Sequence, residues 1–145
     1  GPLQPPAHTY AAVIPAFLAA ACSGTPLPVH GNGTQCRDFT FVGSVVDVLA
    51  QAITRQVSHP DPVNLAFGTR VTLLEVIAEL EHILERRLPV DHLPTRVGDV
   101  RRSQADSGLL LELFPDLVPT DLVTGLRATV EWFELTRPWE RSTPY

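Results

Sequence analysis

The sequence is organised around a tight turn at residues 31–33, where Gly31 and Gly33 flank Asn32. Two glycines this close together predict a turn with positive φ angles, which side chains other than glycine rarely adopt. Residues 27–30 before the turn and residues 39–42 after it have the β-branched and aromatic composition of short strands. The stretch therefore predicts a strand–turn–strand unit.

Arg37 and Asp38 are the strong charges of this unit. An arginine fixed at a strand edge presents a planar fork that suits carboxylate or phosphate oxygens. A surface arginine paired with a nearby carboxylate explains the same residues equally well.

The charge balance argues against several classes of function. The net charge is −5, and no basic stripe is present that would bind nucleic acid. All 11 positive side chains are arginine, so no lysine is available for Schiff-base or other lysine catalysis. No apolar run has the length of a membrane span. Cys22 and Cys36 lack metal-ligand spacing and indicate a reducing compartment, so we expect a cytoplasmic protein without a membrane partner.

Several segments show the period of amphipathic helices, namely 10–22, 45–53, 73–84 and two segments after residue 106. The clearest of them starts at Thr72 and Glu75, which form a capping box. Ser44 is predicted to cap the helix at 45–53, and Thr120 or Asp121 to cap the last helix.

Residues 63–67 are nearly continuous in apolar character, which predicts a strand covered on both faces of a parallel sheet. The apolar stripes of the helices at 45–53 and 73–84 also need a sheet to cover them. The sequence supplies too few strands for such a sheet. We therefore expect these surfaces to be buried against a further domain. Without that domain, the chain should self-associate into a homo-oligomer or stay partly disordered around residues 63–67.

The spacing Gly-x-Gly-x-Gln-x-Arg-Asp-Phe-x-Phe-Val, at residues 31–42, resembles a block of the NAD-dependent epimerase/dehydratase family. These are the extended short-chain dehydrogenases that act on nucleotide sugars. The resemblance runs from Gly1 to about Phe133 and implies that Arg37 holds the diphosphate of a nucleotide sugar. Gln35 in the same block, and Pro28 just before it, are implied substrate-binding residues. His30 falls where the family places an aromatic ring beside the base, although a solvent-facing strand histidine is an equal alternative.

Two further segments resemble the family's substrate-binding elements. Tyr-Ala-Ala-Val-Ile-Pro, at residues 10–15, implies that the backbone amides of Ala12 and Val13 approach the diphosphate; a buried packing helix is the alternative. Arg-Val-Gly-Asp, at residues 96–99, implies that Arg96 binds the diphosphate and Asp99 the ribose. A simple turn, closed by Asp99 onto its own backbone, is the alternative for that segment.

The family's glycine-rich dinucleotide fingerprint and its catalytic Tyr-x-x-x-Lys are not in this sequence. The resemblance thus implies an α/β fold and one unit, residues 1–145, that forms the C-terminal nucleotide-sugar-binding portion of an enzyme. NAD and the catalytic tyrosine would come from an N-terminal Rossmann domain outside the sequence, in the same or a separate polypeptide. Epimerisation, dehydration and decarboxylation all remain open, so the enzyme would be an isomerase or a lyase. A non-catalytic nucleotide-sugar-binding module and a structural fragment are the alternatives.

Overall fold

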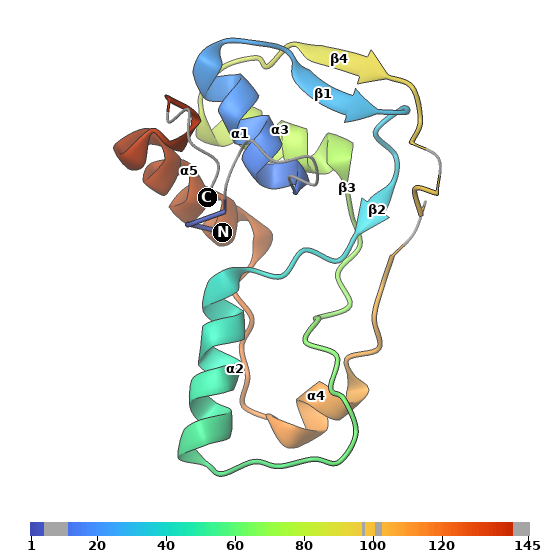
Figure 1. The fold of residues 1–145 in the computed structure, drawn as a ribbon, viewed down its shortest axis with the longest axis vertical. Coiled ribbons are helices and arrows are strands. Elements are labelled where there is room, and N and C mark those ends of the chain that lie inside the picture. The colour runs from blue at the N-terminus through green and yellow to red at the C-terminus, as the bar shows by residue number, and fades with distance from the viewer. Residues whose placement is uncertain (5–11, 97, 101–102, 141–145) are drawn as a thin grey trace.

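The structure is a computed structural model that describes residues 1–4, 12–96, 98–100 and 103–140. It contains helices with short strands between them, as expected for an α/β fold (Figure 1). The elements are α1 (Val13–Ser23), β1 (Leu27–His30), β2 (Cys36–Arg37), α2 (Val42–Thr54), β3 (Val71–Thr72), α3 (Leu73–Ile83), β4 (Val90–Leu93), α4 (Gly108–Leu113), α5 (Leu122–Thr136) and a 3₁₀ turn, η1 (Pro138–Glu140). Within these described residues, no helix has the length and apolar content needed to cross a membrane.

The described strands form two separate pairs. β1 runs parallel to β4, with Leu27 opposite Val90 and His30 opposite Leu93. β2 pairs antiparallel with β3, with Arg37 opposite Val71. The parallel pair joins segments about sixty residues apart and brings the end of β1 beside the loop that follows β4 (Figure 1). This pairing positions the candidate site.

The main hydrophobic core lies between α1, β1, α3 and α5. Phe17, Leu27, Val76 and Phe133 are completely buried there. The apolar stripe of α3 packs into this core, so the prediction that the stripe needs a sheet from elsewhere is wrong. The reason is that α1 and α5, which are far apart in the sequence, cover it together.

Two of the helix caps predicted from the sequence are confirmed. The Thr72 side chain accepts from the Glu75 backbone N–H, and the Glu75 carboxylate accepts from the Thr72 backbone N–H at 2.7 Å, which completes the capping box of α3. Asp121 caps α5 by accepting from the Thr124 backbone N–H. Ser44, in contrast, does not cap α2, which begins two residues earlier. Its buried hydroxyl accepts from the Thr120 backbone N–H at 2.9 Å and fastens α2 to the segment before α5.

Two predicted strands are not strands in the structure. Residues 39–41 are irregular, and Val42 already belongs to α2. Residues 63–67 are also irregular, because among the described residues no strand lies beside them. Their apolar side chains are instead half-buried against a second, smaller cluster between α2 and α4 that is centred on Val48, Leu110 and Phe114. Apolar composition is thus explained by packing without strand pairing.

The helix α2 exposes much of the apolar face that the sequence predicted to be buried. Val46 and Leu49 are about half exposed and Ile53 is 77% exposed, whereas Val48 is buried. Figure 1 shows α2 and α4 at the end of the molecule opposite to β1 and β4. The described part of the chain covers one side of α2 and leaves the other side open.

The predicted N-terminal linker and C-terminal tail lie partly outside the described residues. Residues 5–11, which include Tyr10 at the expected start of the first helix, and residues 141–145 are not described. The tail was predicted to be irregular, but its described part forms η1. Its Trp139 stacks on Phe133 with 6.1 Å between the ring centroids.

Candidate functional site

The predicted glycine turn lies at the centre of the candidate site. Gly31 and Gly33 have φ angles of +76° and +78°, which confirms the prediction of positive φ. The Gly31 backbone N–H donates to the Leu93 carbonyl at 2.9 Å, which extends the contact between β1 and β4 into the turn. A Cβ atom on Gly33 would lie 2.8 Å from Cδ2 of Leu74. The turn therefore packs closely against the start of α3.

Beside this turn is a cavity of about 380 Å³. It brings together every residue that was predicted in the sequence analysis to bind substrate, except Ala12. The lining residues are Val13, Ala16, Pro28, His30, Gln35, Arg37, Leu73, Leu93, Arg96 and Asp99. These residues come from α1, β1, the segment between β1 and β2, β2, the start of α3, the end of β4 and the loop after β4. One cavity thus collects side chains from segments that are far apart in the chain.

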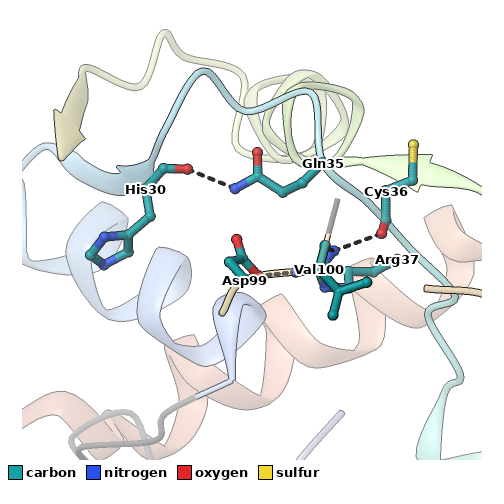
Figure 2. A network of polar contacts seen from close by, with 6 residues as sticks. All are labelled: His30, Gln35, Cys36, Arg37, Asp99 and Val100. Atoms are coloured by element: carbon teal, nitrogen blue, oxygen red, sulfur yellow. Dashed lines mark hydrogen bonds and ion pairs between the residues drawn. The ribbon is translucent and has the colours of Figure 1, made fainter. Parts of the chain in front are cut away.

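Arg37 is held by three acceptors (Figure 2). Its Nη1 donates to the carbonyls of Cys36 at 2.8 Å and Val100 at 2.6 Å, and its Nη2 forms an ion pair with Oδ1 of Asp99. Arg37 and Asp99 are 28% and 23% exposed, so the pair is only partly open to solvent. The pairing with a nearby carboxylate, one of the alternatives considered from the sequence, is therefore present, and Arg37 also lines the cavity.

Asp38, the neighbour of Arg37, does not contribute to the cavity lining. Its carboxylate accepts from the backbone N–H of Gly68 at 2.9 Å, and from the backbone N–H and hydroxyl of Thr69 at 3.2 and 2.8 Å. The two adjacent charges therefore have separate tasks: Arg37 lines the cavity, and Asp38 fixes the segment that leads to β3.

His30 has a defined ring orientation. Its Nδ1 lies 3.0 Å from the Pro94 carbonyl oxygen, and because a carbonyl can only accept, this nitrogen carries the hydrogen. In the neutral ring, Nε2 is then an acceptor. The Gln35 amide nitrogen donates to the His30 backbone carbonyl at 2.7 Å (Figure 2). The His30 ring thus ties the end of β1 to the loop after β4, and Gln35 closes the turn back onto the end of β1.

Arg96 lies on the loop after β4 and is exposed. Among the described residues, no carboxylate lies within ion-pair distance of its guanidinium. Arg37 and Arg96 line the same cavity, and Asp99 neutralises one of the two positive charges. The cavity therefore retains one net positive charge from these three residues.

The N-terminal end of α1 borders the same cavity through Val13 and Ala16. Ala12 is the N-cap residue; it is exposed, provides no side-chain cap, and lies outside the lining residues. No acidic residue occupies the first turn of α1. The positive end of the helix dipole is therefore not neutralised by its own side chains, and it adds to the attraction for an anion.

Sequence reasoning missed Ala16, Leu73 and Leu93 as lining residues and Val100 as the acceptor of Arg37. Leu93 reaches the cavity through the parallel pairing of β4 with β1, which no local pattern indicates. The spacing of Ala16 from Val13, one helical turn, was a usable signal. The Val100 contact involves a backbone carbonyl and has no side-chain signature.

The cavity combines two guanidinium groups and one carboxylate with an apolar lining from Val13, Leu73 and Leu93. Guanidinium groups bind phosphate oxygens, and a carboxylate accepts from hydroxyl groups. Across the described residues, no group of three or more His, Cys, Asp or Glu side chains is arranged to hold a metal ion. The arrangement is therefore suited to an anionic ligand that also carries hydroxyl groups.

Comparison with known proteins gives consistent results. The sequence model of the NAD dependent epimerase/dehydratase family matches residues 1–66. A UDP-glucose 4-epimerase of Mycolicibacterium smegmatis is 29% identical over 133 residues, which cover 92% of this chain and 42% of that protein.

Two solved structures extend the likeness to the fold. The UDP-glucose 4-epimerase of Thermotoga maritima, solved with UDP-glucose, superposes with a TM-score of 0.83 at 30% identity and covers 94% of this chain and 43% of its own. MoeE5, solved with UDP-glucuronic acid and NAD, superposes with a TM-score of 0.77 at 28% identity and covers 91% and 44%. The chain thus spans less than half the length of each of these proteins. In sequence over residues 1–66 and in fold over most of its length, this chain is thus similar to proteins of the NAD dependent epimerase/dehydratase family.

Proposed function

We propose that this chain is the nucleotide-sugar-binding portion of an NAD-dependent sugar-nucleotide epimerase or dehydratase, similar to UDP-glucose 4-epimerase. The observation that carries the proposal is the single cavity lined by Arg37, Arg96 and Asp99 next to the N-terminal end of α1. The similar proteins are named as enzymes that act on nucleotide sugars, and two of the similar solved structures contain a UDP-sugar.

In this proposal the ligand's diphosphate lies between Arg37 and Arg96. The backbone N–H of Val13, in the first turn of α1, contributes a further hydrogen-bond donor, and the helix dipole of α1 stabilises the negative charge of the diphosphate. Asp99 accepts from the ribose hydroxyls. Pro28 and His30, on the same strand, form the part of the cavity that contacts the base. These roles combine the positions of the lining residues with the family resemblance.

The described residues do not fit NAD. The strands form pairs of two, whereas a dinucleotide-binding domain needs a wide parallel sheet. The sequence has neither the glycine-rich fingerprint nor a lysine. We therefore assign NAD, and the catalytic tyrosine and lysine of the family, to an N-terminal Rossmann domain, in the same or a separate polypeptide.

The open face of α2 supports this domain arrangement. Val46, Leu49 and Ile53 lie on one side of the helix and are each more than half exposed. An amphipathic helix normally buries such a stripe against another layer. We propose that the Rossmann domain covers this face.

The alternative function is a non-catalytic nucleotide-sugar-binding module, which is favoured by the fact that all the proposed binding groups belong to this chain.

Cys22 and Cys36 are both free thiols, in agreement with a reducing compartment, and we place the protein in the cytoplasm.

Calorimetric titration of the 145-residue chain with UDP-glucose and dTDP-glucose tests the binding function. Arg37→Ala and Arg96→Ala should each weaken binding about tenfold or more, because a charge-assisted contact is worth about 1.5–3 kcal/mol. Arg37→Lys should recover part of the loss, since an ammonium cannot form the bidentate contact. Arg127→Ala removes the same charge from the exposed side of α5 and serves as the control. Unchanged affinity in both cavity variants would contradict the proposal.

A further inference from the structure

The guanidinium of Arg37 is engaged by acceptors of the chain itself. Two of its three acceptors, the Asp99 carboxylate and the Val100 carbonyl, belong to the loop after β4 (Figure 2). The third is the carbonyl of Cys36, the preceding residue. The orientation of the Arg37 side chain is therefore set by a loop about sixty residues further along the chain.

These contacts leave part of the guanidinium available. Arginine has five N–H donors, of which the three contacts use both on Nη1 and one on Nη2. The Nε hydrogen and the second Nη2 hydrogen have no acceptor among the described residues. Two donors of one planar group can bind phosphate while the contact with Asp99 persists.

Asp99 also keeps one oxygen available. Oδ1 is paired with Arg37, and Oδ2 has no partner among the described residues. A carboxylate that lines the cavity in this way can accept from a ligand hydroxyl without releasing the arginine.

We propose that Asp99 is a positioning residue for Arg37, and that the ion pair persists when a nucleoside diphosphate binds. This inference rests on the proposed function and adds to it a second role for Asp99, besides any contact with the ribose. The physical basis is pre-organisation. A free arginine side chain has many rotamers, and the energy of ordering it lowers affinity unless the protein has already fixed it.

The sign of one effect separates the two roles. Asp99 places a negative charge next to a site for an anion, so its charge alone repels phosphate. If Asp99 contacts only the ribose, its removal leaves the affinity for a ligand without ribose unchanged or increases it. If Asp99 positions Arg37, its removal weakens the binding of that ligand as well.

The experiment therefore compares uridine diphosphate with inorganic pyrophosphate, which has no ribose. Dissociation constants are measured by NMR titration of the full chain. The proteins compared are the wild type, the single variants Asp99→Ala, Asp99→Asn and Arg37→Lys, and the double variant that combines Arg37→Lys with Asp99→Ala. Asp99→Asn preserves the side-chain volume and serves if the alanine variant does not fold. Asp91→Asn removes a carboxylate from an exposed position of β4 outside the cavity lining and is the matched control.

We expect Asp99→Ala to weaken pyrophosphate binding about fivefold, and to have no further effect once Arg37 is lysine. Unchanged or tighter pyrophosphate binding in the Asp99 variants overturns the inference. An equal loss in the Arg37→Lys background overturns it too, since Asp99 would then act without Arg37.

The Arg37 guanidinium itself provides a readout without ligand. In the wild-type chain the ion pair should slow rotation of the Nη groups and separate their NMR signals, which the Arg37→Lys spectrum assigns. Asp99→Ala should average these signals. Equal averaging in both chains would overturn the positioning role. If the wild-type chain binds neither ligand, the proposed function fails, and these signals still decide whether Asp99 positions Arg37.

Discussion

The exposed apolar stripe of α2 leads to the prediction that bears most directly on domain organisation. Val46, Leu49 and Ile53 are 56, 55 and 77% exposed. Complete burial of such a side chain is worth about 1.5–3 kcal/mol. Burying the exposed fractions of all three would therefore contribute about 4 kcal/mol, or roughly a thousandfold in an association constant.

We expect substitution of the three residues by glutamine to reduce self-association of the chain strongly and to change its own stability little. Glutamine favours helix, and surface substitutions usually change the free energy of unfolding by no more than about 0.5 kcal/mol each. Sedimentation velocity over a range of concentrations measures the association, and guanidinium unfolding at low concentration measures the stability.

The control is a triple glutamine variant of Leu111, Val118 and Leu135, three exposed apolar residues outside α2. It removes apolar surface that is spread over α4, the following loop and α5, and it should leave self-association unchanged. Two results would refute the reasoning: a loss of more than about 2 kcal/mol in the stability of the α2 variant, or the same change in association for both variants. The first would mean that the stripe is packed within the chain, and the second that the effect is not specific to this face.

Three further predictions concern local structure and activity. The Glu75 carboxylate has a lowered pKa, because it accepts hydrogen bonds, first from the Thr72 backbone and then from the Thr72 side chain. The ionised Glu75 carboxylate thus stabilises the fold above its unfolded-state pKa, and this stabilisation is lost as the pH falls through its folded-state pKa. The unfolding free energy of the Glu75→Gln variant should therefore depend less on pH over the acidic range than that of the wild-type chain. Gly33→Ala should destabilise the chain by about 1–3 kcal/mol in chemical unfolding, because it forces a side chain into positive φ against Leu74; an unchanged midpoint would contradict the close packing of the turn. The 145-residue chain with added NAD should not convert UDP-glucose, since it has no lysine, and any product detected by chromatography would contradict the domain assignment.

Sequence reasoning succeeded where the interacting groups are close together in the chain. The capping box joins Thr72 to Glu75, and the cap of α5 joins Asp121 to Thr124. Such contacts involve neighbouring residues in a fixed local geometry, so the residue types alone identify them.

It failed where an element needs a partner. Residues 63–67 have strand composition, but apolar side chains at half-buried positions look the same in an irregular segment. Ser44 has the residue type of a cap, yet its hydroxyl binds the backbone of Thr120, 76 residues away. Whether a strand pairs or a hydroxyl caps depends on what lies next to it in space.

For the site, the amino-acid sequence is enough to identify the chemical groups: the positive-φ glycine turn, two arginines, one carboxylate and a helix start without acidic residues. The family resemblance named seven of the ten residues that line the cavity, and also Ala12, which lies outside the lining. The way in which these groups are combined depends on contacts between distant segments. The parallel pairing of β1 with β4 brings Asp99 to Arg37 across 62 residues, and Asp38, adjacent to Arg37, binds Gly68 and Thr69 instead. The physical reason is that hydrogen bonds and ion pairs depend on distance in space, and local patterns in a sequence carry no information about separations of this length.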